Sequence, residues 1–175
     1  RTALVCLMTA NNEVGTIQPI AEAAALAHAA GAWLHSDAAQ AVGKIEVNVR
    51  ALDVDLLSLS GHKLYGPMGI GALFVRRRPR VRLAPLVYGG GQERGIRAGT
   101  LPMPLIVGLG HAVSLAEAAR AETTARHHSL REALFERLDR SGLRYTLNGP
   151  RDKDQRLPGT LSLSFHNIRR DALFT

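Results

Sequence analysis

The order of elements along the chain predicts an α/β fold. Short apolar runs typical of buried strands alternate with an alanine-rich segment typical of a helix. Strand, helix and strand in this order are characteristic of a mainly parallel sheet with right-handed crossovers. The chain has 175 residues, of which 46% are hydrophobic and 21% are charged. This size and composition are those of a globular protein with one domain, or one domain and part of another.

The first half of the chain supplies the sheet. Residues 2–8 form an apolar run that predicts a strand. The alanine-rich stretch 19–30 predicts a helix, with Pro19 near its start and Gly31 just past its end, where these residues are favoured. Further strands are predicted at residues 32–35, 55–60 and 71–75.

The second half predicts a loop, helical structure and one more strand. Residues 88–100 are rich in glycine and have unusual backbone freedom. Residues 105–140 predict two helices or one kinked rod, and the alternation at 160–165 predicts a half-buried strand. We therefore place a domain boundary within this helical region, between residues 1–118 and residues 119–175, and expect the second domain to begin with a connecting helix and to be incomplete.

The charge of the chain suits nucleic-acid binding, but its pattern does not. The formal net charge is +7, and residues 76–82 form a basic cluster. This cluster follows a predicted strand, has no interleaved aromatic residues and matches no nucleic-acid fold signature, so we interpret it as a solvated connector. The sequence therefore predicts no nucleic-acid partner.

Other function classes are excluded by what the sequence lacks. No run of about 18 apolar residues and no signal-peptide pattern occur, which predicts a cytoplasmic protein without a membrane partner. The single cysteine, Cys6, excludes an internal disulfide and a Cys-rich metal site, and no metal site is predicted. Cys6 lies within an apolar run, so we expect a buried structural thiol rather than a reactive nucleophile.

Lys63 is the best candidate for a chemistry that requires a primary amine. Only three lysines occur against nineteen arginines, and Lys63 follows a predicted strand. Ser60 and His62 can donate hydrogen bonds to a phosphate, and the glycine at 61 lets the backbone approach closely. A Schiff-base lysine needs such a site. Taken alone, the sequence Ser60-Gly61-His62-Lys63 fits a surface lysine in a glycine-rich turn equally well.

Asp37 favours a cofactor site. Pyridoxal 5′-phosphate (PLP) acts as an electron sink while its pyridine nitrogen is protonated, and a carboxylate at a strand end is the usual partner of that proton. Gln40, three residues later, is able to hydrogen-bond the phenolic oxygen of the ring. Alone, Asp37 fits the cap of a helix that begins at residues 38–42. Asp37, Gln40 and Lys63 together favour PLP.

Four segments resemble the class V, fold-type I PLP enzymes, and specifically the NifS/IscS-like cysteine desulfurases. The separation of 26 residues between Asp37 and Lys63 (63 − 37) is the one this family shows. The resemblance covers essentially the whole chain and is weakest after about residue 120. It implies that residues 1–118 are the C-terminal half of the PLP-binding large domain, and that residues 119–175 are a connecting helix and the start of a smaller α+β domain. The segments are His35-Ser36-Asp37-Ala38-Ala39-Gln40, Ser60 to Pro67 with Gly69-Ile70-Gly71, Asn11 to Gly15, and Gly89 to Thr100.

The resemblance implies a role for each matching residue. Lys63 would carry the cofactor as a Schiff base, Asp37 would pair with the pyridinium, and Gln40 would bind the phenolate oxygen. Ser60 and His62 would bind the phosphate. The threonine matching Thr100 reaches the cofactor of the neighbouring subunit in relatives, which implies a homodimer. The asparagine matching Asn12 contacts the substrate carboxylate; a loop-capping role is the alternative.

The resemblance also implies the reaction. L-cysteine would be converted to L-alanine, and the sulfur would pass as an enzyme persulfide to an iron-sulfur scaffold or another sulfur-acceptor protein. The family's nucleophilic cysteine and substrate-carboxylate arginine are expected after residue 175, so we expect the chain alone to be inactive. Selenocysteine lyase, another class V enzyme, or a truncated chain that acts only through dimerisation remain alternatives.

Overall fold

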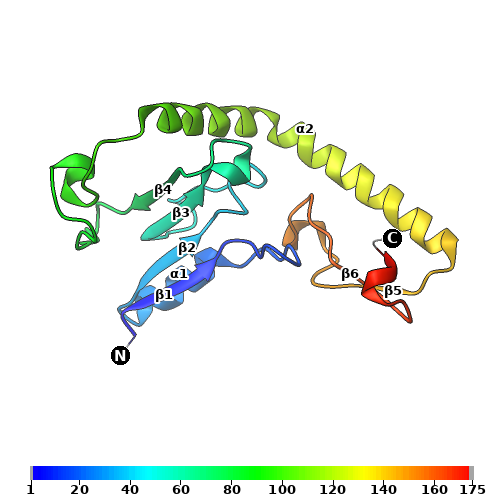
Figure 1. Ribbon diagram of the computed structural model, residues 1–175. Coiled ribbons are helices and arrows are strands. Elements are labelled where there is room, and N and C mark those ends of the chain that lie inside the picture. The colour runs from blue at the N-terminus through cyan, green and yellow to red at the C-terminus, as the bar shows by residue number, and fades with distance from the viewer. Residues whose placement is uncertain (1, 174–175) are drawn as a thin grey trace.

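A computed structural model describes residues 2–173 and shows two sheets connected by one long helix (Figure 1). The larger sheet has the order β1-β2-β3-β4. The pairs β1–β2 and β2–β3 are parallel, and β3–β4 is antiparallel, so the predicted α/β fold with a mainly parallel sheet is confirmed. The four strands are β1 (Leu4–Met8), β2 (Trp33–Asp37), β3 (Leu56–Ser60) and β4 (Gly71–Val75).

Helix α1 (Ile20–Ala29) covers one face of this sheet and forms the core with it. Pro19 occupies its N-cap, and Gly31 follows its end with a φ of +69°, which a residue without Cβ adopts readily. The helix contributes small buried side chains, which allow close packing against the sheet. The fully buried members of this core include Ile20, Ala24, Leu34, Val54 and Leu157.

The opposite face of β1 is exposed. Strand residues alternate between the two faces of a sheet. Val5 and Leu7 point toward the core, whereas Leu4, Cys6 and Met8 are exposed. The prediction of a buried Cys6 is therefore wrong. The apolar run predicted the strand correctly, but burial of its second face depends on a covering element, and none of the described residues supplies one.

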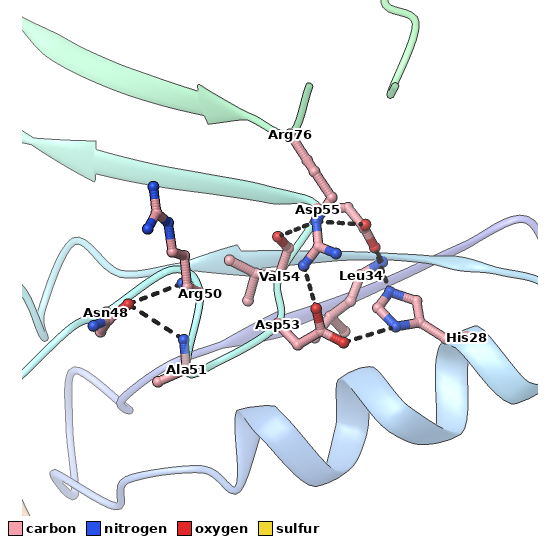
Figure 2. Close-up of polar contacts among 9 residues, drawn as sticks. All are labelled: His28, Leu34, Asn48, Arg50, Ala51, Asp53, Val54, Asp55 and Arg76. Atoms are coloured by element: carbon pink, nitrogen blue, oxygen red, sulfur yellow. Dashed lines mark hydrogen bonds and ion pairs between the residues drawn. The ribbon is translucent and has the colours of Figure 1, made fainter. Parts of the chain in front are cut away.

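A charged network holds the amino-terminal edge of the sheet (Figure 2). The Asp55 carboxylate is fully buried and accepts hydrogen bonds from the Leu34 backbone N–H at 2.8 Å and from His28 Nε2 at 2.7 Å. Its second oxygen lies 3.2 Å from Arg76 Nε. Asp53 contacts His28 Nδ1 at 3.3 Å and Arg76 Nη2 at 2.5 Å. This network ties α1, β2, β3 and β4 together on the side away from Lys63.

Helix α2 (Met103–Ser141) is a single helix of 39 residues. It ends at Gly142, which has a φ of +72°. Of the two interpretations of residues 105–140, two helices or one rod, the single rod is observed. The predicted domain boundary at 118/119 falls inside this helix and stays a prediction. Among residues 2–173, no helix is both long and apolar enough to cross a membrane.

A two-stranded antiparallel sheet follows α2. Phe135 of α2 stacks on Tyr145 of this sheet with ring centroids 6.0 Å apart. The two strands are β5 (Tyr145–Leu147) and β6 (Leu163–Phe165). Four 3-10 helices complete the described elements: η1 (Gly61–Leu64), η2 (Gln92–Gly95), η3 (Lys153–Gln155) and η4 (Arg170–Leu173).

Candidate cofactor site

The three parallel strands β1, β2 and β3 end at one edge of the sheet. Met8 is in register with Asp37, and Asp37 is in register with Ser58, two residues before the end of β3. The loops that carry Asn12, Gln40 and Lys63 all leave from this edge. Ligand sites of α/β sheets form at the carboxyl ends of the strands. The structure thus brings these predicted residues to the same edge.

Asp37 is held rigidly at the end of β2. Its backbone carbonyl accepts a hydrogen bond from the Thr9 N–H at 2.7 Å. Beside it, the buried hydroxyls of Thr9 and Ser36 lie 2.7 Å apart, and Ser36 donates to the Leu7 carbonyl at 2.9 Å. The Asp37 side chain is exposed, and its Oδ1 accepts from the Ala39 N–H at 2.9 Å. A fixed backbone thus presents an accessible carboxylate, which suits a protonated ring nitrogen.

The segment after Asp37 forms hydrogen-bonded turns rather than a helix. The Ala38 N–H bonds to the carbonyl of Ser58 at 2.8 Å, which keeps this segment against β3. The alternative in which Asp37 caps a helix at residues 38–42 is therefore wrong. The turns place the partly buried Gln40 next to Lys44, whose Nζ donates to Gln40 Oε1 at 2.6 Å.

Ser60, His62 and Lys63 lie where β3 passes into η1. Ser60 Oγ and His62 Nδ1 are 2.9 Å apart, so the two predicted phosphate ligands form a pair. A Cβ at Gly61 would lie 2.9 Å from Ile70 Cγ2, so the tight return of the chain requires glycine here. Lys63 is exposed and lines a cavity of about 640 Å³ that lies between η1, α2 and residues 158–160.

Lys44 lines the same cavity as Lys63. Burial, and secondarily the charge of Lys63, lower the pKa of the Lys44 amine below its ordinary value. Lys44 is therefore a partly buried cation that lies near the charge of Lys63.

The structure separates the roles of the two asparagines that follow β1. Asn11 Oδ1 accepts hydrogen bonds from the N–H groups of Glu13 at 2.9 Å and Val14 at 2.8 Å, so Asn11 is the residue that caps the loop. Asn12 is exposed. Among the described residues it makes no side-chain hydrogen bond, so its amide is available to a ligand.

The glycine-rich segment 88–100 does not lie at this edge. Strand β4 runs antiparallel to β3, and its last residue, Val75, pairs with the first residue of β3. The segment therefore leaves from the opposite edge, as the green loop beyond the arrowhead of β4 shows (Figure 1). Thr100 is exposed and is not among the residues that line the cavity of Lys63. Its predicted contact with the cofactor of a second subunit stays a prediction.

Arg156 supports the Asn12 loop, and sequence reasoning missed it. Its side chain is only 1% exposed and donates to the carbonyls of Val14 at 2.7 Å, Pro150 at 2.7 Å and Asn148. Desolvation lowers the pKa of its guanidinium from the ordinary value. A backbone hydrogen bond of 2.8 Å from the Leu157 N–H to the Gly15 carbonyl reinforces this contact. No spacing signal in the sequence marks this arginine as buried.

The groups at the carboxyl edge fit PLP chemically. A pyridinium needs a carboxylate, a phenolate oxygen needs an amide or similar donor, a phosphate needs hydroxyl and imidazole donors, and the aldehyde needs a lysine amine. The carboxyl edge presents each of these groups, and all of them come from residues 37–63. They are Asp37, Gln40, Ser60, His62 and Lys63.

Comparison with known proteins agrees with this chemistry. The family model described as aminotransferase class-V matches residues 1–175. Cysteine desulfurase IscS of Ehrlichia chaffeensis is 48% identical over 99% of this chain and 42% of the relative. A solved NifS-like protein has a TM-score of 0.88 and 40% identity over 98% of this chain and 46% of its own. A structure titled SspA in complex with cysteine has a TM-score of 0.73 and 40% identity over 95% of this chain and 44% of its own.

The chain spans less than half the length of these relatives. The family model nevertheless matches all of it, and the fold agrees with that of the solved NifS-like protein. The resemblance predicted from the motifs is thereby confirmed. The chain belongs to the class-V aminotransferase family of PLP-dependent enzymes.

Proposed function

We propose that this chain is the cofactor-binding portion of a cysteine desulfurase that takes sulfur from L-cysteine and leaves L-alanine. The observation that carries the proposal is the convergence of Asp37 and Lys63 at one edge of the parallel sheet. A relative that is 48% identical over this stretch is named cysteine desulfurase IscS, and a structure of a similar protein is titled SspA in complex with cysteine. Both names support L-cysteine as the substrate.

Each site residue has one task in this proposal. Lys63 holds the cofactor covalently, and its amine, once released by a substrate amine, carries the proton of the substrate α-carbon. Asp37 keeps the ring nitrogen protonated, and Gln40 donates to the phenolic oxygen. Ser60 and His62 donate to the phosphate. When bound, PLP supplies the electron sink that makes the α-proton acidic.

Asn12 and Thr100 have two further tasks in this proposal. The free amide of Asn12 would receive the substrate carboxylate, held in place by the loop that Arg156 supports. Thr100 would reach the phosphate of a second subunit, which makes the active enzyme a homodimer. The sulfur would leave as a persulfide for an iron-sulfur scaffold or another acceptor protein, in the cytoplasm.

An absorbance titration with PLP tests the proposal. We expect the purified chain to form a new absorbance band with PLP that borohydride removes. Lys63→Ala should abolish the band, whereas Lys153→Ala, a change of the same kind at an exposed lysine outside the site, should leave it intact. A wild-type chain that forms no reducible band, or a Lys63→Ala chain that keeps it, contradicts the proposal.

A further inference from the structure

The hydrogen bond between Lys44 and Gln40 fixes which of the two terminal atoms of the Gln40 carboxamide contacts Lys44. A lysine ammonium has donors only, so the amide atom 2.6 Å from Lys44 Nζ must be the carbonyl oxygen, Oε1. The NH₂ group therefore occupies the other position. Among residues 2–173 this NH₂ group donates to no protein acceptor. The contact leaves the Gln40 NH₂ group available to donate a hydrogen bond to a ligand.

The cavity around Lys44 is lined by basic side chains and offers Lys44 no carboxylate. The cavity that Lys44 and Lys63 share is also lined by Arg120, His111 and His127, and none of its lining residues is a carboxylate. Two exposed acids act on Arg120 instead: Glu117 pairs with it at 2.8 Å, and the charge of Glu46 also raises the pKa of the Arg120 guanidinium. Within the part of the chain that the structure describes, Lys44 is thus a partly buried cation that forms no ion pair with a carboxylate, and its hydrogen-bond acceptor is a neutral amide.

We propose that Lys44 is a positioning residue of the cofactor site, which holds the Gln40 carboxamide so that its NH₂ group donates to the phenolic oxygen of the bound cofactor. The inference rests on the proposed function. If Gln40 turned over, its carbonyl oxygen would face the phenolic oxygen and repel it, and Lys44 would lose its acceptor. Lys44 therefore makes the wrong orientation unfavourable at both ends of the amide.

The same arrangement affects protonation at the cofactor. A donor to the phenolic oxygen and a cation close to Lys63 both disfavour a proton on the nitrogen that joins Lys63 to the cofactor. Loss of Lys44 removes the cation and frees the amide. The pH midpoint of the cofactor absorbance band should then rise. Because loss of the Lys44 charge alone also raises this midpoint, the positioning role is tested by comparing the PLP affinities of Lys44 variants with and without Gln40.

The test combines four single variants and one double variant with PLP titration and a pH titration of the absorbance band. Lys44→Met removes donor and charge at similar volume, and Lys44→Arg keeps both. Lys153→Met is the matched control for loss of one positive charge. Gln40→Ala, alone and combined with Lys44→Met, shows whether Lys44 acts through Gln40.

We expect Lys44→Met to weaken PLP binding by about threefold to tenfold, the effect of one misdirected hydrogen bond. It should also raise the pH midpoint of the band, with Lys44→Arg and Lys153→Met close to wild type. In the Gln40→Ala background, Lys44→Met should have no further effect on PLP affinity. An equal effect with and without Gln40, or wild-type behaviour of Lys44→Met, overturns the inference while the proposed function stands. A wild-type chain with no band overturns both.

Discussion

Replacement of Arg156 by methionine should strongly destabilise the chain. The Arg156 side chain is 1% exposed and donates to the backbone carbonyls of Val14, Asn148 and Pro150. Methionine retains much of the volume but leaves three carbonyls without their donor. At about 1 kcal/mol for each lost hydrogen bond in a buried place, we expect a loss of about 3 kcal/mol in the free energy of unfolding. For a chain of this size this corresponds to a decrease in melting temperature of about 6–12 °C.

Urea denaturation followed by circular dichroism measures this loss. Arg151→Met is the matched control, because Arg151 lies five residues away in the same segment and is exposed, so we expect its effect to stay within about 0.5 kcal/mol. Arg156→Lys should fall between the two, because an ammonium cannot reach all three carbonyls in the fixed fork of a guanidinium. If Arg156→Met costs no more than Arg151→Met, the inferred support of the Asn12 loop by Arg156 is refuted.

Three further predictions concern other parts of the structure. Asp55→Ala should lower the free energy of unfolding by about 3–5 kcal/mol, because it leaves buried partners of a charged network unpaired, and urea denaturation measures this. Gly43→Ala should also destabilise, since a Cβ there would lie 2.8 Å from Ala116 Cβ and the residue has a φ of +75°; a melting temperature equal to wild type would contradict this. The Lys44 amine should titrate below 10.5 by NMR, and its pKa should rise in Lys63→Met, since burial and the charge of Lys63 lower it; an ordinary wild-type value would contradict this. At a pH between the Lys44 pKa of the folded chain and the higher Lys44 pKa of the unfolded chain, the unfolded chain binds more protons. The free energy of unfolding should therefore increase with pH over this window.

The sheet and the carboxyl-edge residues were predictable because each depends on local signals. Apolar runs of strand length and an alanine-rich helix specify elements wherever they fold. Strand ends of a parallel sheet meet at one edge by topology alone. The positions of Asp37 and Lys63 relative to the strands therefore followed from the order of the elements.

Features that depend on packing between distant segments were not predictable. Cys6 lies in an apolar run, but only the arrangement of α1 decides that its face of the sheet is exposed. Arg156 belongs to a residue type that is mostly exposed, and its carbonyl partners lie up to 142 residues away in the sequence. The contact between Lys44 and Gln40 joins residues that are four positions apart in the sequence. This spacing predicts a contact only when the conformation of the turn between the two residues is known.

Mass spectrometric mapping of the borohydride-reduced chain tests the central claim most directly. After incubation with PLP, reduction and proteolysis, a pyridoxyl group stays attached to the lysine that carried the cofactor. The chain has only the lysines 44, 63 and 153, so each alternative gives a distinct peptide. We predict modification at Lys63, at one group per chain, which is lost in Asp37→Ala at limiting PLP. Modification spread over all three lysines, or located mainly at Lys44 or Lys153, would contradict the assignment of this edge of the sheet as the cofactor site.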